Sequence, residues 1–322
     1  MAARVVVTRA VPEPALELLR ASADVWVSPH DRALSDDELR EAVAGADAVV
    51  TMLHDRVDGA LLDAAGPKLR VVANLAVGYD NVDVAAASAR GVVVTNTPGV
   101  LTDATADLAM GLLLAVTRRL GEGERLLRAG TPWDWAMDFM LGSGLQGKSL
   151  GVVGLGAIGR ATARRAWAFG MEIAYTQRHR AEAAIEAALG GARFVEREEL
   201  LASADVVSLH CPLTAETHHL IDAAALRAMR PTAYLVNTAR GPVVDEAALV
   251  EALRSRVIAG AALDVFEHEP EVHPGLLELD NVVIAPHLGS ATVETRNAMA
   301  MLAARNALAV LAGDDPPTPV KP

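Results

Sequence analysis

The stretch Leu150-Gly-Val-Val-Gly154-Leu-Gly156-Ala-Ile-Gly159 decides the fold of this chain. A Val-rich run that predicts a buried strand ends in a glycine-rich turn, and a segment of helical period follows from Ile158 to Phe169. Glycines at these spacings let the backbone turn tightly and approach a pyrophosphate, which binds exposed amides at the start of the helix. The pattern predicts a dinucleotide site, and the alternative is a tight structural turn. The residues predicted to form the site are Gly154, Gly156, Ala157, Ile158 and Gly159.

The end of the next predicted strand, Glu172 to Tyr175, bears on which dinucleotide is bound. An acidic residue about 20 positions beyond the glycines normally binds the ribose hydroxyls of NAD. Here Gln177 takes that place, and Arg178 and Arg180 follow it. Because no carboxylate would repel a 2′-phosphate and two guanidinium groups could bind it, the sequence favours NADP(H) over NAD(H). The alternative is a solvated basic turn on the surface.

Outward from this turn, Val-rich runs alternate with Ala/Leu-rich segments of helical period, which predicts parallel strands joined by crossover helices. Six strands fit a dinucleotide-binding sheet. They are predicted at 150–153, 172–175, 206–210, 233–237, 259–264 and 282–285. Before residue 100, strands are predicted at 5–7, 25–27, 48–52, 71–73 and 92–95, with helices at 14–21, 36–44, 59–64 and 83–89.

Two long helices join these parts. An apolar helix at 103–119 is longer than a simple crossover needs, and we interpret it as an interdomain helix. The helix at 292–311 follows the completed second sheet, so we expect it to pack on the first domain. We therefore predict an α/β protein with two doubly wound parallel-sheet domains. A Rossmann dinucleotide-binding domain (99–289) is inserted in a discontinuous flavodoxin-like substrate domain (1–98 and 290–322).

Composition narrows the classes of function. The 322 residues carry a formal net charge of −12, which opposes general affinity for nucleic acid or anionic membranes. The longest apolar stretches, such as 108–116, fall well short of the roughly 20 residues that span a bilayer. Cys211 is the single cysteine, and the N-terminal residues lack the segments of a secretory signal. We expect a cytoplasmic protein with no membrane, nucleic-acid or metal partner.

Three reactive side chains follow predicted strands downstream of the glycine turn: Arg240, Glu269 and His287. A guanidinium can bind a carboxylate through two hydrogen bonds, an imidazole can transfer a proton near neutral pH, and a carboxylate can keep that imidazole charged. Singly, each has a structural explanation as a turn cap, a surface acid or a buried histidine. Ligands of open α/β folds bind after the strands of the sheet, so their convergence there favours a site that reduces a 2-keto acid.

Besides the glycine turn, five stretches of the chain form recognisable motifs. They are Asn74-Leu-Ala-Val77-Gly78-Tyr-Asp-Asn81, Gly91-Val-Val-Val-Thr-Asn96-Thr-Pro98, Asn237-Thr-Ala-Arg240-Gly241, Asp264-Val-Phe-Glu-His-Glu269-Pro270 and Pro286-His287-Leu-Gly289-Ser290-Ala291. Together they resemble the D-isomer-specific 2-hydroxyacid dehydrogenase family, and within it most closely the glyoxylate/hydroxypyruvate reductases. The resemblance covers nearly the whole chain, and the family pattern selects the glutamate directly before Pro270.

The resemblance implies roles at matching positions. Arg240 would bind the substrate carboxylate and polarise the C2 carbonyl, and the backbone amides of Val77 and Gly78 would hold the other side of the carboxylate. His287 would protonate the C2 oxygen as NADPH delivers hydride, while Glu269 keeps the imidazole protonated, which gives a D-2-hydroxy acid. Further expected neighbours are Asp264, Thr238, Ala239 and Gly289 for the cofactor, Pro212 on its adenosine side, and Ser290 for the substrate.

The resemblance also implies a homodimer. Related reductases carry a Trp-x-x-Trp pair before the nucleotide domain, and Trp133-Asp-Trp135 has this place with a spacing shorter by one. Trp135 would then reach the partner's active site and contact substrate there. The alternative is that the aromatic loop packs under the interdomain helix.

Two other functions remain open. One is an NAD-dependent D-2-hydroxyacid dehydrogenase with another substrate, of the D-lactate, 3-phosphoglycerate or phosphite type. The other is a nucleotide-responsive binding protein like the corepressors of the same fold, which carry long extra tails where this sequence has almost none.

Overall fold

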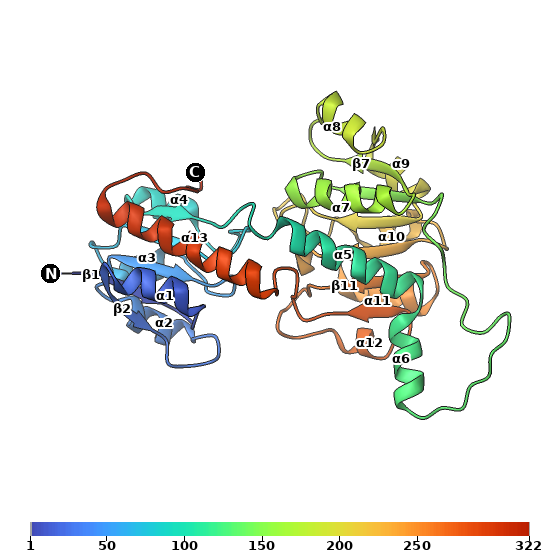
Figure 1. The fold of residues 1–322 in the computed structure, drawn as a ribbon, viewed down its shortest axis with the longest axis horizontal. Coiled ribbons are helices and arrows are strands. Elements are labelled where there is room, and N and C mark those ends of the chain that lie inside the picture. The colour runs from blue at the N-terminus through green and yellow to red at the C-terminus, as the bar shows by residue number, and fades with distance from the viewer. Residues whose placement is uncertain (1, 322) are drawn as a thin grey trace. The chain divides into compact units, whose positions relative to one another are not determined.

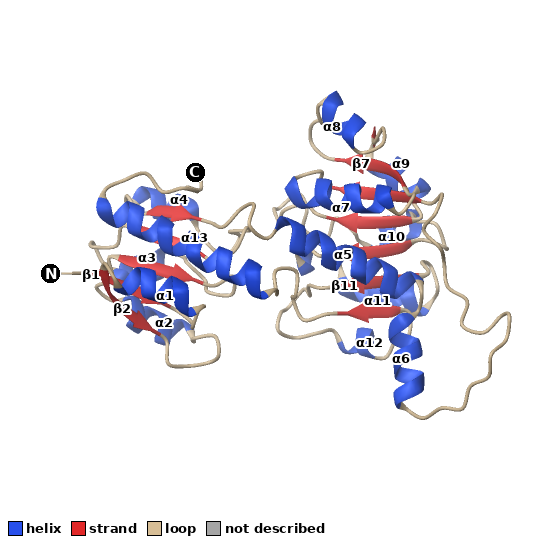
Figure 2. Ribbon diagram, in the orientation of Figure 1, coloured by secondary structure: helices blue, strands red, loops and turns tan. Residues whose placement is uncertain are grey.

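The computed structural model describes residues 2–321, and the chain divides into two compact units. The first unit is Met1–Leu101 with Ala291–Pro322, and the second unit is Thr102–Ser290. Each unit is built on one parallel sheet covered by helices (Figures 1 and 2). The predicted α/β class with two doubly wound parallel sheets is confirmed.

The first unit has a five-stranded sheet of order β2-β1-β3-β4-β5. Helix α13 packs on β3 and β4 and beside α1, while α2, α3 and α4 share a core with the side chains of Val6, Val49 and Val72. The strands are β1 (Ala3–Val7), β2 (Ala23–Val27), β3 (Ala48–Thr51), β4 (Val71–Asn74) and β5 (Val93–Thr95). The helices are α1 (Glu13–Arg20), α2 (Asp36–Val43), α3 (Gly59–Ala65), α4 (Val84–Ala89) and α13 (Val293–Ala312).

Local chemistry sets the ends of the first unit's helices. Ser35 and Glu38 form a reciprocal capping box at the start of α2. The side chain of Thr292 accepts the backbone N–H of Thr295 at the start of α13, and Gly313, with a φ of 90°, ends that helix. The left-handed backbone conformation at this position favours glycine, because glycine has no Cβ.

The second unit has a seven-stranded sheet of order β12-β11-β10-β9-β6-β7-β8. From β6, the strands β7 and β8 are added on one side, and β9 to β12 are added on the other, so the strand order reverses between β6 and β9. Open α/β sheets bind their ligands at such a point. The strands are β6 (Ser149–Val153), β7 (Glu172–Thr176), β8 (Arg193–Phe194), β9 (Val206–Leu209), β10 (Tyr234–Asn237), β11 (Gly260–Leu263) and β12 (Val282–Ile284). The seventh strand, β8, has only two residues and was not predicted because a pair is too short to show a period.

Helices cover both faces of this sheet. Helices α5 (Thr102–Thr117) and α7 (Ala157–Ala168) pack against each other on one face (Figure 1). On the other face, α9, α10 and α11 surround a second apolar core. Their bounds are α9 (Arg197–Ser203), α10 (Ala223–Ala228) and α11 (Glu246–Arg254), and the short helices are α8 (Ala183–Ala188), η1 (Gly241–Val243) and α12 (Pro274–Leu277).

The long helix predicted at 103–119 is present as α5, and a second helix that was not predicted follows it. Helix α5 ends at Thr117, Arg119 has a left-handed φ of 54°, and α6 (Leu120–Arg128) follows. Gly121 and Gly123 weaken helix propensity after the break, and none of the described residues of α6 is buried. Within residues 2–321, no helix combines the length and the apolar character needed to cross a membrane.

Candidate active site

A histidine–carboxylate pair lies at the carboxyl edge of the second unit's sheet. Nδ1 of His287 is 2.8 Å from Oε2 of Glu269. The backbone N–H of Phe266 donates to Oε1 of the same carboxylate at 3.0 Å, which fixes its orientation. Burial acts to raise the pKa of Glu269, but the hydrogen bond with His287 and the charges around it lower that pKa overall. The carboxylate is therefore an anion near neutral pH and favours an imidazolium, whose Nε2 can donate a proton.

The turn that carries His287 is held by Asp264. His287 has a φ of 54°, in the left-handed region that favours glycine. Its N–H donates to the carbonyl of Asp264 at 2.8 Å, and the buried Asp264 carboxylate accepts the N–H groups of Leu288 at 2.6 Å and Gly289 at 2.8 Å. Burial raises the pKa of Asp264. These three bonds hold a strained backbone in place and thereby fix the direction of the imidazole.

Arg240 follows β10 in a turn pinned by Asn237. The Asn237 amide donates to the carbonyl of Arg240 at 2.9 Å and accepts the N–H of Ala239 at 3.0 Å. The Arg240 guanidinium donates to the carbonyl of Ala239 at 2.9 Å. The base of this side chain is therefore rigidly positioned at the end of the strand.

The Arg240 turn packs directly on the turn that carries Glu269. A Cβ on Gly241 would collide with the carbonyl oxygen of Phe266, so only glycine permits this approach. The charge of Arg240 contributes to the lowered pKa of Glu269, which places the two groups in the same electrostatic neighbourhood. The structure thus brings together three predicted residues that follow three adjacent strands, β10, β11 and β12.

The glycine turn has the shape that a dinucleotide needs. Gly154 has a φ of 92°, and a Cβ there would lie 2.9 Å from the backbone of His210 and Cys211. A Cβ on Gly159 would collide with the carbonyl oxygen of Gly154. Gly156, in contrast, has open space around its Cβ position and stands directly before α7, a helix of 12 residues. Open space beside the amides of a helix N-terminus fits a pyrophosphate, and Ala157 and Ile158 provide the first of these amides.

Gln177 links the glycine turn to the basic turn after β7. Its Oε1 accepts the N–H of Leu155 at 3.0 Å, and its Nε2 donates to the carbonyl of His179 at 2.7 Å. Arg178 is exposed. Gln177 therefore lies directly after β7 and against the glycine turn, at the position where an acidic residue would bind the ribose hydroxyls of NAD.

Arg180 is held by a buried carboxylate. Its guanidinium forms two hydrogen bonds of 2.9 Å with Glu186, and the hydroxyl of Tyr175 donates to the same carboxylate at 2.6 Å. These bonds from Arg180 and Tyr175 lower the pKa of Glu186 to about 2. Two thirds of the Arg180 side chain remains exposed, so the pairing orients it without covering it.

The remaining predicted cofactor residues lie after β9 and β10. Thr238 is buried, and its hydroxyl has no hydrogen-bond partner among the described residues. Pro212 is exposed. Burial raises the pKa of the Cys211 thiol to about 11, which fits a structural thiol and opposes a nucleophile. Burial also lowers the pKa of His210 to about 4, so this neighbouring imidazole is neutral.

In the first unit, two backbone amides are oriented by their neighbours. The carbonyl of Ala76 accepts the N–H of Thr97 at 2.8 Å, and the carbonyl of Val77 accepts from the Asn96 amide at 2.8 Å. A trans peptide places the next N–H opposite its carbonyl. The N–H groups of Val77 and Gly78 therefore point away from residues 96–97, as donors to an anion would.

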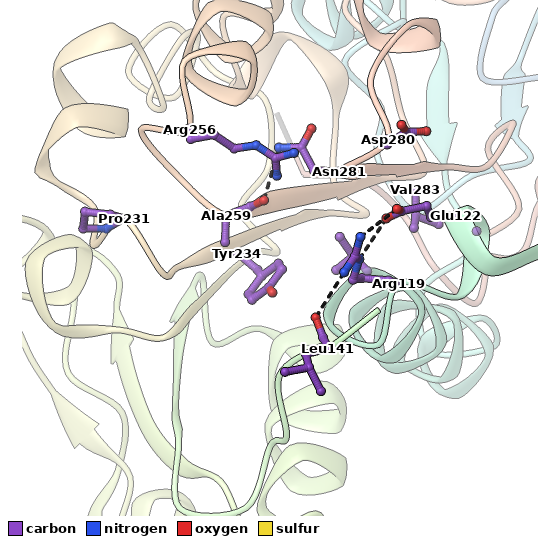
Figure 3. A pocket seen from close by; sticks show the side chains of 12 residues that line it. Arg119, Glu122, Leu141, Pro231, Tyr234, Arg256, Ala259, Asp280, Asn281 and Val283 are labelled. Carbon is purple, nitrogen blue, oxygen red and sulfur yellow. Dashed lines mark hydrogen bonds and ion pairs between the residues drawn. The ribbon is translucent and has the colours of Figure 1, made fainter. Parts of the chain in front are cut away.

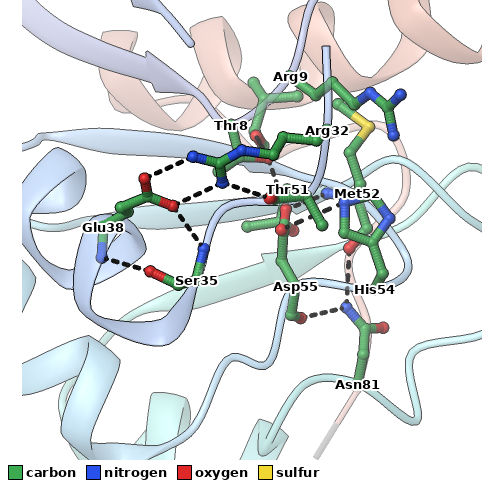
Figure 4. Close-up of polar contacts among 12 residues, drawn as sticks. Thr8, Arg9, Arg32, Ser35, Glu38, Thr51, Met52, His54, Asp55 and Asn81 are labelled. Carbon is green, nitrogen blue, oxygen red and sulfur yellow. Dashed lines mark hydrogen bonds and ion pairs between the residues drawn. The ribbon is translucent and has the colours of Figure 1, made fainter. Parts of the chain in front are cut away.

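A polar network supports the loop after β3 in the first unit (Figure 4). The buried Asp55 carboxylate accepts the hydroxyl of Thr8 at 2.5 Å and the N–H of Met52 at 2.7 Å. The side-chain amide of Asn81 donates to the carbonyls of Met52 and Asp55 at 3.1 and 2.9 Å. Asn74 ties the same network to the Val77–Gly78 segment, because its amide donates to the carbonyl of Gly78 at 3.0 Å.

Trp135 lies in the long loop after α6 and is 71% exposed. Trp133 stacks on Phe139, with ring centroids 5.9 Å apart. We define residues 120–141 as the apolar arm, since they carry most of the exposed large apolar side chains of the second unit. These are Leu120, Leu127, Trp133, Trp135, Met137, Phe139 and Leu141.

A cavity of about 490 Å³ lies elsewhere in the second unit (Figure 3). It is lined by Arg119, Tyr234 and Asn281, which lie at or just before the amino ends of their elements. Arg119 pairs with Glu122 at 2.7 Å. The reactive side chains follow the carboxyl ends of the same strands, about 10 Å away along a four-residue strand. This cavity is therefore not the candidate active site.

A seven-stranded doubly wound sheet, with a glycine-rich turn and a His–Glu pair at its carboxyl edge, defines a nucleotide-dependent oxidoreductase. The family model for "D-isomer specific 2-hydroxyacid dehydrogenase, NAD binding domain" matches residues 110–289. The chain belongs to the D-isomer specific 2-hydroxyacid dehydrogenase family, and it is an NAD(P)-dependent oxidoreductase.

Relatives cover almost the whole chain. It is 49% identical to a glyoxylate reductase of Thermofilum pendens over 98% of this chain and 93% of the relative. It is 50% identical to a glyoxylate reductase of Thermococcus onnurineus over 99% and 96%. A crystal structure of the NADPH-dependent glyoxylate/hydroxypyruvate reductase from Sinorhizobium meliloti, in complex with NADP and malonate, matches with a TM-score of 0.85 at 38% identity, over 99% of this chain and 97% of that one.

Sequence reasoning missed residues that position the site. Asn237, Glu186 and Asn74 act through hydrogen bonds to backbone or side chains that lie near them only in the fold. Asn237 could have been noticed, because a buried amide at the end of a strand usually binds the turn that follows. Glu186 gave no signal, since it lies within an ordinary Ala-rich helix.

Proposed function

We propose that this protein catalyses NADPH-dependent reduction of a small 2-keto acid, glyoxylate or hydroxypyruvate, to the D-2-hydroxy acid. The observation that carries the proposal is the 2.8 Å pair of His287 and Glu269 beside the Arg240 turn, at the carboxyl edge of the sheet that holds the glycine turn. Two relatives that are 49% and 50% identical to this chain are named glyoxylate reductases, which supports the substrate class.

His287 is the proposed proton donor. Glu269 engages Nδ1, so Nε2 is the ring nitrogen that presents a proton to the C2 oxygen. When bound, a reduced nicotinamide supplies the hydride that adds to C2. As the C2–O bond changes from carbonyl to alkoxide, the proton of Nε2 moves to oxygen and leaves a neutral imidazole. The Glu269 anion holds the ring in orientation and favours its charged form before transfer.

Arg240 is the proposed anchor of the substrate carboxylate. A guanidinium offers parallel N–H groups that match two carboxylate oxygens, and the same charge polarises the adjacent C2 carbonyl. We propose the N–H groups of Val77 and Gly78 as further donors to the substrate carboxylate, and Ser290 as a polar neighbour on the substrate side.

The proposed cofactor is NADP(H). The glycine turn and the first amides of α7 would hold its pyrophosphate, and Arg178 and Arg180 its 2′-phosphate. Thr238, Ala239, Asp264 and Gly289 would lie along the nicotinamide half, with Pro212 on the adenosine side. The unpartnered buried hydroxyl of Thr238 is consistent with a ligand at this edge.

We also propose a homodimer in which the apolar arm packs on the partner, with Trp135 reaching the partner's substrate. Large apolar side chains exposed together mark an interaction surface. A cytoplasmic location stays a prediction of the sequence.

A substrate and cofactor panel tests the function. Glyoxylate, hydroxypyruvate, pyruvate and 3-phosphohydroxypyruvate are each assayed with NADPH and with NADH, and kcat/KM is compared. We expect the largest values for glyoxylate or hydroxypyruvate with NADPH. A preference for NADH on another keto acid would favour the NAD-dependent alternative, and no turnover on any keto acid would favour a binding protein.

A further inference from the structure

A cluster of two histidines and one glutamate lies in the second unit, on side chains that the proposed reaction does not use. His218 and His219 lie in the loop between β9 and α10, and Glu267 lies in the turn after β11. One ligand atom from each side chain lies within 4.8 Å of the other two. Imidazole nitrogens and carboxylate oxygens are good ligands for borderline transition-metal ions.

His219 and Glu267 form the fixed half of this cluster. Nε2 of His219 is 2.6 Å from Oε1 of Glu267. The backbone N–H of Glu246 donates to Oε2 of Glu267 at 3.2 Å, and the backbone N–H of Glu267 donates to the Glu246 carboxylate at 2.6 Å. These bonds turn Oε1 toward the imidazole.

His218 forms the movable half. Its ring stacks on the ring of His219, with centroids 4.1 Å apart and planes at 29°. His218 is exposed, so rotation of its side chain costs no core packing. Tetrahedral ligands at the usual zinc distances are about 3.3 Å apart. Rotation of His218 would bring its ligand atom closer to the other two, which now lie within 4.8 Å of it, and an ion would separate His219 Nε2 and Glu267 Oε1 from their 2.6 Å contact.

We propose that His218, His219 and Glu267 bind a divalent transition-metal ion, with Zn²⁺ as the ion that fits best and water as its fourth ligand. Two nitrogens and one carboxylate oxygen match Zn²⁺ and disfavour Mg²⁺ and Ca²⁺, which take oxygen ligands. The ion ties the loop after β9 to the turn after β11. An ion pair of His219 with Glu267 accounts for the 2.6 Å contact without a metal, but it gives His218 no part, so His218 discriminates between the two.

The test uses the full chain, freed of metal with EDTA and desalted. Isothermal titration with ZnCl₂ at pH 7.5 is expected to show one site, and the melting temperature is expected to rise because the ion binds the folded state. His218→Gln should weaken binding at least about tenfold and remove the rise in melting temperature. His30→Gln, which removes an exposed imidazole in the first unit, serves as the matched control and should change neither.

Two further variants keep the result decisive. His219→Gln should weaken binding as His218→Gln does, and the far-ultraviolet spectrum verifies its fold. His287→Ala removes the other His–Glu pair and should leave Zn²⁺ binding intact. Absence of binding by the wild-type protein, unchanged binding in His218→Gln or in His219→Gln, or loss of binding only in His287→Ala would each overturn the proposal. None of these outcomes depends on which keto acid is reduced.

Discussion

At the scale of single residues, the Glu269 carboxylate matters through its charge. Its pKa is lowered overall, so it is an anion across the neutral range, and it favours the imidazolium of His287. Reduction needs the protonated ring, and a neutral side chain at position 269 favours that form less. As the pH rises, the variant should therefore lose reduction activity at a lower pH than the wild-type protein does. We expect Glu269→Gln to move the alkaline half-point of kcat/KM for glyoxylate reduction down by about one pH unit.

The reverse reaction provides the internal check for Glu269→Gln. Oxidation of the hydroxy acid needs the neutral imidazole, so its acidic half-point should move down as well. A loss of activity in both directions with unmoved pH profiles would mean that Glu269 only supports the fold of the turn.

The choice of cofactor also rests on single residues. Gln177→Asp combined with Arg178→Ser should raise the ratio of kcat/KM with NADH to that with NADPH, because a carboxylate binds ribose hydroxyls and repels the 2′-phosphate. Arg197→Ser, which removes an exposed arginine elsewhere in the second unit, is the control for lost positive charge. An unchanged ratio in the double variant would remove these residues from cofactor selection.

The sequence predicts reactive residues better than the residues that position them. Arg240, Glu269 and His287 follow strands that could be recognised from their Val-rich runs, and parallel strands present their carboxyl ends at one edge. Asp264 could be placed only by resemblance, while its bonds to the Leu288 and Gly289 amides depend on the packing of β11 beside β12.

At the scale of elements, substitutions at two glycines can distinguish the effect of helix propensity from the effect of a left-handed backbone conformation. Gly111 lies on the exposed face of α5, and a Cβ there meets nothing within 4 Å. We expect Gly111→Ala to raise the free energy of unfolding by about 0.5–1 kcal/mol, because alanine loses less entropy in a helix. Urea unfolding of the full chain measures this difference.

Gly313 is the matched control for Gly111. A Cβ there also meets nothing, but its φ of 90° disfavours alanine. Gly313→Ala should lower stability by about 1–2 kcal/mol. Equal effects of the two substitutions would show that neither propensity nor backbone conformation decides the result.

Element boundaries were predictable where caps and periods are strong and not where they are weak. The start of α2 at the Ser35 capping box is visible in the sequence. The break between α5 and α6 is not, because the left-handed Arg119 is accompanied by a contact with a residue distant in sequence, its hydrogen bond to the carbonyl of Leu141. The two-residue β8 exists only as an addition to the edge of β7.

At the scale of the whole molecule, the exposed side chains of the apolar arm lead us to expect that two copies of the chain form a dimer. Met137 and Leu141 are 80% and 65% exposed, which is unfavourable in water unless another surface covers them. Met137→Glu with Leu141→Glu should convert a dimer into a monomer in size-exclusion chromatography with light scattering. Leu277→Glu, at a site 62% exposed outside the arm, should leave the dimer intact. A wild-type monomer, or an intact dimer in the double variant, would contradict the proposed role of the arm.

The histidine–glutamate cluster illustrates what sequence motifs cannot provide at this scale. Its ligands lie 48 residues apart in a loop and a turn, with no recognisable spacing, and the sequence predicted no metal. Only the parallel pairing of the strands brings such segments together.

The central claim is that His287 delivers the proton in the reduction of a 2-keto acid, and stopped-flow oxidation of NADPH with glyoxylate tests it most directly. Wild-type protein and His287→Ala are compared at saturating substrate, with NADPH binding measured separately by fluorescence. We predict that His287→Ala binds NADPH normally and reduces glyoxylate about 10²–10⁴-fold more slowly. Turnover within a few-fold of wild type would contradict the account.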